Sequence, residues 1–225
     1  MKDKKEKILL SWSGGKDSAL ALYEIKKNKI YEISALLTVL TSEYDRISMH
    51  GVRKELLERQ AHALRLPLKK VLIKKNATSG DYEEKIKKIL NEYVKNGISA
   101  VAFGDVNLLD VREYREKNLD KIGIKGIFPL WKNDSLDLAN RFIELGFKSI
   151  ITCVDSKTLD PKFIGRDFDN KLLSELPSSV DPIGENGEFH SFVYEGPIFK
   201  EKISFKIGKI VLRNERFCYV DLLPW

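Results

Sequence analysis

The chain of 225 residues is long enough for one large domain, or for a main domain with a smaller second one. Its composition, 43% hydrophobic and 32% charged, is typical of a folded globular protein and excludes a disordered one. The net charge is +6, but the excess is made of scattered lysines without an accompanying arginine and aromatic stripe. This distribution favours a solvated surface over a nucleic-acid-binding face.

Two cysteines, Cys153 and Cys218, lie far apart and form no CxxC or other metal-ligand pattern. A disulfide framework and a zinc site are therefore not expected, and the expected location is the reducing cytoplasm. The charged N-terminus is unlike a signal peptide, and no apolar run approaches the roughly 20 residues of a membrane helix.

The first 130 residues alternate predicted strands and helices. Strands are predicted at 7–12, 32–40, 68–73 and 98–105, and helices at 17–27, 81–95 and 109–121. Another helix is predicted from about residue 51, where one face carries Val52, Leu56, Leu57, Ala61 and Leu64. This alternation predicts right-handed crossovers and an α/β fold, with a mainly parallel Rossmann-like sheet covered by helices on both faces.

The pattern changes after residues 126–131. A helix at 135–145 and a strand at 149–154 precede a long stretch rich in Asp, Gly and Pro, and the C-terminal end is β-like. We therefore predict two domains, 1–130 and 131–225, the second being smaller and of the α+β class. Because no low-complexity linker separates them, the two parts are expected to pack tightly.

The segment "SGGKDS", Ser13–Ser18, joins the first predicted strand to the first predicted helix. Two adjacent glycines allow a tight turn that exposes backbone N–H groups, and the helix adds its positive N-terminal end. The serines can donate to phosphate oxygens and Lys16 adds a positive charge. An acidic Asp17 at an anion site is explained if Mg²⁺ is present. The alternative is an ordinary helix N-terminus preceded by a glycine turn.

The loop is neither G-x-x-x-x-G-K-S/T nor G-x-G-x-x-G, because its two glycines are adjacent. It resembles the pyrophosphate-binding loop of the N-type ATP pyrophosphatases, which cut ATP between the α- and β-phosphates. Ligands in such sheets lie beyond the carboxyl ends of the strands, where "GD" at 104–105 is also expected. The candidate ATP-binding residues are Ser11, Ser13, Gly14, Gly15, Lys16, Asp17, Ser18, Gly104 and Asp105.

A second cluster of reactive side chains lies in "DPIGENGEFH", residues 181–190. Glu185 and Glu188 flank the turn Asn186–Gly187, and Glu188 and His190 share a face of an extended strand. Two carboxylates and an imidazole can hold an amine, act as a general base or hold Mg²⁺. The alternative is a solvated hairpin, since Asn-Gly is a strong turn signal.

Two further positions are candidates for phosphate or substrate contacts. His50 and Arg53 precede a predicted helix, and their alternative role is that of surface caps on that helix. Asp105 follows a strand at the expected ligand edge. Arg115, on the next predicted helix, is expected to be an ordinary ion-pair partner.

Together these segments resemble the diphthine–ammonia ligase family over nearly the whole chain. The matching segments are "SGGKDS", "HGVRKELLERQAHAL", "FGDVNLLDVREYREKNL", "FPLW", "ITCVDSKTLD" and "DPIGENGEFHSFVYEGPIF". The resemblance implies an ATP-binding domain of the adenine nucleotide alpha hydrolase type, followed by a substrate domain. It also implies a ligase that consumes ATP and ammonia and converts the diphthine carboxylate of elongation factor 2 to diphthamide, releasing AMP and pyrophosphate.

The resemblance assigns roles to the candidate residues. Glu185, Glu188 and His190 are the expected catalytic residues, and His50, Arg53, Asn186 and Gly187 the expected substrate contacts. ATP and Mg²⁺ are the expected cofactors, with Asp17 as a metal ligand, and a homodimer is an open expectation.

The late motif departs from that of ligases acting on elongation factor 2, which resembles Gly-Glu-Gly-Gly-Glu-Phe-Glu-Thr. Here Asn186 replaces a glycine and His190 an acid, as in a sister subgroup, and Ile183 replaces the cysteine common in that subgroup. A small carboxylate such as a corrinoid is therefore an alternative substrate. A tRNA-modifying enzyme and a non-catalytic nucleotide sensor are further alternatives, although the first usually needs cysteine pairs that this chain lacks.

Overall fold

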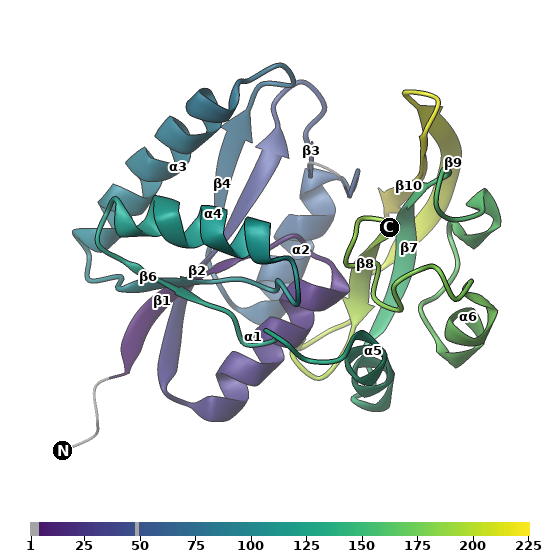
Figure 1. Cartoon of the computed structure of the whole chain (residues 1–225), viewed down its shortest axis with the longest axis horizontal. Helices are drawn as coiled ribbons and strands as arrows, with labels where there is room; N and C mark the ends of the chain where they lie inside the picture. The colour runs from purple at the N-terminus through teal and green to yellow at the C-terminus, as the bar shows by residue number, and fades with distance from the viewer. Residues whose placement is uncertain (1–4, 48–49) are drawn as a thin grey trace.

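The structure, a computed structural model, describes residues 5–47 and 50–225 (Figure 1). Its first sheet contains five parallel strands in the order β4-β2-β1-β5-β6. They are β1 (Glu6–Ser11), β2 (Tyr31–Thr41), β4 (Leu68–Ile73), β5 (Ala100–Ala102) and β6 (Lys125–Ile127). The short β3 (Arg46–Ile47) pairs antiparallel with β2. The predicted α/β class and parallel sheet are confirmed.

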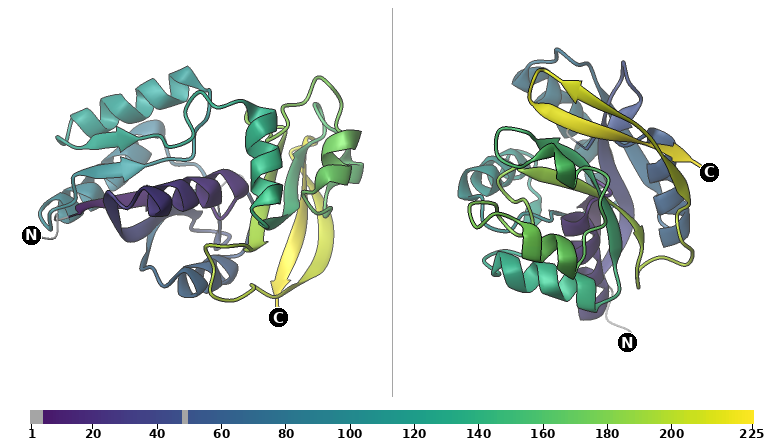
Figure 2. Two further views of the ribbon diagram at one scale, coloured as in Figure 1. Left: turned by 90° about the horizontal axis from the view of Figure 1, so that it is seen from below. Right: turned by 90° about the vertical axis from the view of Figure 1, so that its right-hand side faces the viewer.

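Helices cover both faces of this sheet, as predicted (Figure 2). They are α1 (Lys16–Asn28), α2 (Lys54–Leu64), α3 (Ser79–Val94) and α4 (Leu109–Asp120). Alternate residues of β1 point to opposite faces, so that Ile8 and Leu10 join the cluster containing α1 and α2. Leu9 joins the cluster containing α3 and α4. Buried residues on both faces explain why these strands are continuously apolar in sequence.

The second part contains an antiparallel sheet in the order β8-β7-β10-β9. Its elements are α5 (Ser135–Glu144), β7 (Lys148–Asp155), a 3-10 turn at Pro161–Phe163, α6 (Asn170–Glu175), β8 (Phe189–Glu195), β9 (Phe205–Arg213) and β10 (Phe217–Pro224). The predicted α+β character is confirmed. One hydrophobic cluster runs from Ile25 of α1 through Phe142 of α5 to Phe192 of β8. The division at residue 130 remains a prediction, and the two sheets share this core.

The order of the first sheet reverses at β1, which has β2 on one side and β5 on the other. The loops that follow β1 and β5 therefore lead to helices on opposite faces, α1 and α4, and leave a crevice between them. Ligands of open α/β sheets bind at this kind of switch point. The fold thus brings Ser13–Ser18 and Gly104–Asp105 to one edge of the sheet.

Two predicted elements are longer than the observed ones. Strand β5 ends at Ala102, so Gly104 and Asp105 lie in the loop beyond it. Helix α2 begins only at Lys54, because Arg53 is extended, with φ −64° and ψ 140°, and bridges to Arg46. His50 and Arg53 therefore lie in the connection before the helix.

Among residues 5–47 and 50–225, no helix combines the length and apolar character needed to span a bilayer.

Candidate active site

Two glycines of the loop after β1 are favoured for different reasons, Gly14 by its backbone conformation and Gly15 by the space around it. Gly14 has φ +77°, and a Cβ there would lie 2.7 Å from Gln60 Oε1. Gly15 caps α1, and a Cβ there would lie 2.9 Å from His50 Cε1. Ser13 Oγ accepts from the Gly15 N–H at 3.2 Å, and Ser18 Oγ donates to the Gly15 carbonyl at 2.9 Å. The loop is preorganised at the positive end of a 13-residue helix.

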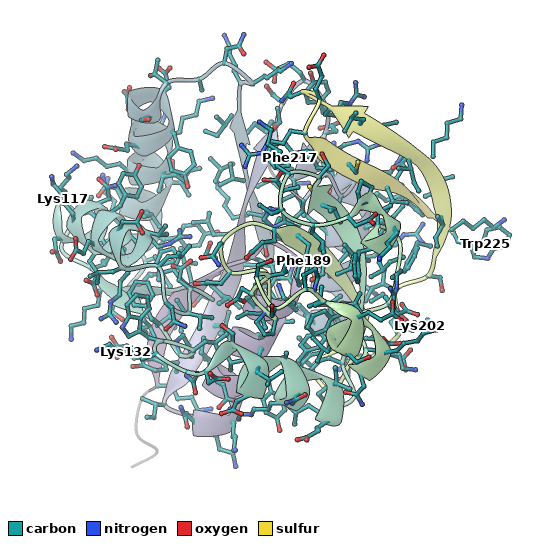
Figure 3. The ribbon with its side chains drawn as sticks, turned by 45° about the vertical axis from the view of Figure 1, so that its right-hand side comes forward. Lys117, Lys132, Phe189, Lys202, Phe217 and Trp225 are labelled. Carbon is teal, nitrogen blue, oxygen red and sulfur yellow. The ribbon has the colours of Figure 1, made fainter. Side chains whose placement is uncertain are left out.

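Two charged residues open α1. The Lys16 side chain is 5% exposed, and its Nζ lies 3.2 Å from Asp17 Oδ2 and 5.0 Å from the centroid of the Phe189 ring. Figure 3 labels Phe189 in the middle of the molecule. Burial raises the pKa of Asp17, and the adjacent Lys16 ammonium only partly opposes this. A cation bound beside Asp17 would therefore be stabilised by its carboxylate.

Strand β8, at the edge of the second sheet, pairs directly with this loop. The Val193 N–H donates to the Gly14 carbonyl at 2.9 Å, and the Lys16 N–H donates to Ser191 Oγ at 3.3 Å. Gln60 of α2 is fully buried and donates to both the Gly14 carbonyl and the Val193 carbonyl. The second part of the chain is thus hydrogen-bonded to the candidate phosphate loop.

Two histidines stack above the loop. The rings of His50 and His190 have centroids 4.6 Å apart, and His50 Nδ1 lies 3.2 Å from the Ser191 carbonyl. Burial lowers the pKa of His50 to about 4, and it lowers the pKa of His190 well below its ordinary range. Both imidazoles are therefore neutral near pH 7, so neither ring supplies a positive charge to a phosphate.

Glu185 connects the late motif to the loop after β5. Its Oε1 accepts from the backbone N–H groups of Val106 and Asn107, both at 2.9 Å. Burial raises the pKa of Glu185, and these two hydrogen bonds oppose the rise. A Cβ on Gly104, in the same loop, would lie 2.8 Å from the backbone carbon of Asp17. The two loops of the crevice are therefore in direct contact.

Glu188 is 5% exposed, and its carboxylate accepts hydrogen bonds that stabilise the preceding turn. Its Oε1 accepts from the Asp181 N–H at 3.1 Å and from Asn186 Nδ2 at 3.0 Å. Its Oε2 and the Nε2 of His190 are buried without a hydrogen-bond partner among the described residues. Two such acceptors in one motif call for a ligand or an ordered water. Gly187, with φ +86° and an open Cβ position, forms the exposed turn.

Asp181 was missed by the sequence analysis. Its Oδ1 accepts from the N–H groups of Ile183 and Glu185, and its Oδ2 accepts from Ser135 Oγ at 2.7 Å. Asp followed by Pro is a known turn-starting signal, so the sequence did carry a cue. Gln60 had none, because its partners lie 46 and 133 positions away.

Two residues that were predicted to bind ATP or substrate, Arg53 and Asp105, form ion pairs within the protein. Arg53 makes a bidentate ion pair with Asp221 of β10, at 2.9 and 2.6 Å, and so joins the two sheets. Asp105 lies 2.6 Å from Arg115, which also stacks 4.4 Å above Phe103. Because Arg115 neutralises Asp105, Asp17 is the better placed of the two carboxylates for a metal. Within the described part of the chain, no group of three or more His, Cys, Asp or Glu is arranged to hold one.

A cavity of about 350 Å³ lies between α3 and α4 at the same end of the sheet. Its lining is mainly apolar and aromatic, and both α3 and α4 add polar and charged side chains. The lining residues include Ser11, Leu37, Tyr82, Glu83, Phe103 and Asn118. Since Ser11 and Phe103 come shortly before the two crevice loops, the cavity begins where the phosphate loop begins.

Comparisons with known families agree with this architecture. The family model described as the diphthamide synthase N-terminal domain matches residues 6–126, and the family model described as the diphthamide synthase C-terminal domain matches residues 134–221. The fold and the site together define a class of protein. It has an α/β domain with a candidate phosphate-binding loop at its switch point, and a second domain that is hydrogen-bonded to this loop. The chain belongs to the diphthamide synthase family.

Several curated relatives bear the name diphthine–ammonia ligase. The protein of Bos taurus is 27% identical over 225 residues, covering 90% of this chain and 84% of that protein. The Homo sapiens protein is 25% identical with the same coverage. The Schizosaccharomyces pombe protein is 25% identical over 96% of this chain, which spans 39% of its length.

A solved structure is also similar at a low level. It is the U34-tRNA thiolase NcsA from Methanococcus maripaludis with its 4Fe-4S cluster, 23% identical, with a TM-score of 0.38. The match covers 63% of this chain and 57% of that one.

Proposed function

We propose that this protein is an ATP-dependent ligase that adenylates a carboxylate and transfers ammonia to it, releasing AMP and pyrophosphate. The names of its relatives favour diphthine on elongation factor 2 as the carboxylate. A small carboxylate, such as a corrinoid, is the second candidate. The departures at Asn186 and His190 from the resembled ligase motif support that alternative.

One observation carries the proposal: the Val193 N–H binds the Gly14 carbonyl at 2.9 Å. It joins the phosphate loop to the strand that begins immediately after Glu188. An acyl adenylate hydrolyses if it leaves the site, so its formation and its use must occur side by side. The direct pairing of loop and strand meets that requirement.

The ATP would lie across the crevice at the carboxyl ends of β1 and β5. The N-terminus of α1 and the hydroxyls of Ser13 and Ser18 are suited to phosphate oxygens. The cavity between α3 and α4 has the apolar lining that a purine ring requires, with Asn118 as a polar group at its wall. Ser11 borders this cavity, in keeping with its assignment to ATP.

The chemistry needs two displacements. A carboxylate oxygen attacks the α-phosphorus, and the bond from that phosphorus to the bridging oxygen breaks, so that pyrophosphate leaves with the electron pair. The nitrogen of ammonia then attacks the acyl carbon, and AMP leaves as the carbon–oxygen bond breaks. Donors of the loop and of α1 oppose the negative charge on the departing pyrophosphate.

Ammonia must lose one proton to a base during the second displacement. The carboxylate of Glu188, whose Oε2 is buried and unpartnered, is the candidate base. The imidazole of His190 is neutral near pH 7, so a ring nitrogen can accept a hydrogen bond from the attacking nitrogen. The unpartnered Nε2 of His190 and Oε2 of Glu188 are acceptors of the kind that an ammonium ion would satisfy. Both atoms are shielded from solvent in the described structure.

Asp17 fits as a protein ligand of Mg²⁺ carried by the nucleotide. Its pKa is raised by burial, and Mg²⁺ in nucleotide sites is usually held by one or two carboxylates together with phosphates. When bound, the ion would offset phosphate charge.

The test is a product analysis of one reaction. The protein is mixed with ATP, Mg²⁺, ammonium and elongation factor 2 carrying diphthine. Nucleotides are followed by chromatography, and the modified histidine by mass spectrometry. We expect AMP to form in step with conversion of the acid to the amide, and Glu188→Gln to slow both by about 10²-fold or more.

The outcomes separate substrate from chemistry. AMP formed only with a corrinoid acid would move the substrate to the second candidate. ADP in place of AMP would overturn the proposal itself, because it would mean that a different phosphate bond is cut. Lys117→Ala, on the surface of α4, is the matched control and should leave the rate unchanged.

A further inference from the structure

Strand β9 is the outermost strand of the second sheet, next to β10 (Figure 1). Within the described chain it pairs with β10 alone, so the backbone groups along its other side face outward. The two strands form a hairpin whose turn residues, Asn214 and Glu215, have φ of 50° and 52°, as in the turns favoured between antiparallel strands. The strand has 9 residues, enough to pair with another strand along its length.

Three apolar side chains of β9 are exposed on one face. Ile207 is 59% exposed, and Ile210 and Leu212 are each 57% exposed. Their partners on β10 are Leu222, Val220 and Cys218, which are 1%, 3% and 7% exposed. Because cross-strand partners project to the same face, the apolar side chains of β9 lie on the same face of the sheet as the buried ones of β10. On β9, the edge strand, these side chains are exposed to solvent.

The charges of β9 have a single sign. Lys206, Lys209 and Arg213 are all exposed, and the sequence "FKIGKIVLR" contains no acid. Pairing with a second β9 would gather six positive charges at one junction, and lysines on edge strands oppose self-association. A segment carrying acids would instead meet opposite charges along the strand.

We propose that β9 is a docking edge for an extended segment of a partner protein in which acidic and apolar residues alternate. The segment adds to the second sheet as a fifth strand beside β9, with its apolar side chains against Ile207, Ile210 and Leu212. Its acids pair with Lys206, Lys209 and Arg213. This surface does not depend on the function proposed above, since none of its residues belongs to the crevice.

The probe is a fluorescent, end-capped peptide of 9 residues, the length of β9, in which Glu alternates with Val. Its affinity for the full chain is measured by anisotropy, with a peptide of alternating Lys and Val as the charge control. We expect only the acidic peptide to bind, and raising the salt from about 50 to about 300 mM to weaken it. Amide hydrogen exchange should slow at β9 when the peptide is bound.

Two variants of exposed isoleucines make the test specific. Ile210→Ser should weaken peptide binding by about tenfold or more, because it removes apolar contact area at the centre of the strand without changing the charge. Ile30→Ser alters a residue that is 60% exposed and lies just before β2, and it should leave the affinity unchanged. Neither side chain is in a core, so both variants should fold.

Three results would overturn the proposal: no binding of the acidic peptide, equal binding of both peptides, or equal weakening by both variants. Sedimentation covers the remaining possibility. A dimer that dissociates in Ile210→Ser would show that the edge pairs with a second copy of this chain.

Discussion

Gln60 of helix α2 donates its side-chain amide to the backbone carbonyl of Val193 in strand β8, at 2.6 Å. The same amide donates to the Gly14 carbonyl at 3.0 Å, and its oxygen accepts from Trp12 Nε1 at 2.9 Å. The side chain is fully buried. One residue therefore holds Trp12, which directly follows β1, the candidate phosphate loop and strand β8 in a single arrangement.

Replacing this residue tests that arrangement. Gln60→Leu keeps much of the volume but removes the side-chain hydrogen bonds to two carbonyls and to an indole N–H, so we expect a loss of about 2–4 kcal/mol in the free energy of unfolding. Urea unfolding measures it. His62→Ala, on the same helix, alters a side chain that is 84% exposed and should change stability by less than about 0.5 kcal/mol. Equal stability of the two variants would contradict the role given to Gln60.

A second prediction concerns the contact between the two crevice loops. Gly104→Ala places a Cβ against the backbone of Asp17 and Ser18, at 2.8 to 3.0 Å, and neither can yield as a flexible side chain would. We expect α1 to be displaced and nucleotide affinity to fall by about tenfold or more. Lys171→Ala, which alters an exposed side chain of α6 in the second part of the chain, should leave binding unchanged. Calorimetric titration with ATP distinguishes them.

The buried His50 should make stability depend on pH. Its pKa is lowered from 6.5 to about 4 in the folded chain, so the unfolded chain binds a proton between these values and the folded chain does not. The contribution of neutral His50 to the free energy of unfolding is complete above pH 6.5. As the pH falls toward 4, about 2–3 kcal/mol of it is lost. The raised pKa values of Asp17 and Glu185 change stability with pH in the opposite direction. Because both proteins share these two groups, the difference between wild type and His50→Asn isolates the contribution of His50.

Urea unfolding between about pH 4 and 7.5 measures this slope. The His50→Asn variant should be less dependent on pH across the window. An identical slope in both proteins would mean that His50 is accessible to protons in the folded state.

Asp221 acts in a lower pH range. The guanidinium groups of Arg53 and Arg46 hold its pKa at about 2, below its ordinary 3.8. Its stabilising effect is therefore complete above pH 3.8 and is lost as the pH falls toward 2. Because Arg53 is 41% exposed, solvent screening reduces the expected effect to about 1–2 kcal/mol.

The measurement is thermal unfolding of wild type and Asp221→Asn at several pH values. The two proteins should differ most above pH 4 and converge as the pH approaches 2. A constant difference in stability over the whole pH range would show that the stabilising effect of Asp221 does not depend on its charge.

Local sequence patterns predicted most of the elements. The glycine pair before Lys16 predicted the loop and helix α1, since a positive φ at Gly14 and a helix N-terminus depend on neighbouring residues. The Asn-Gly signal likewise predicted the exposed turn at 186–187. Boundaries were less accurate where the tertiary structure intervened. Helix α2 starts late because Arg53 is held extended toward Asp221.

The sequence by itself thus determined the alternation of strands and helices, the glycine-containing loop before α1 and the identity of the late motif, all of which rest on residues a few positions apart. Only the tertiary structure decided which side chains meet. It paired Arg53 with Asp221, set Glu185 under the Val106 and Asn107 amides, and stacked His190 on His50. These contacts span from about 80 to about 170 positions, and periodicity carries no information about which strand edges lie side by side. Burial then decided the charge states, because the desolvation that neutralises both histidines exists only once the two sheets have packed together.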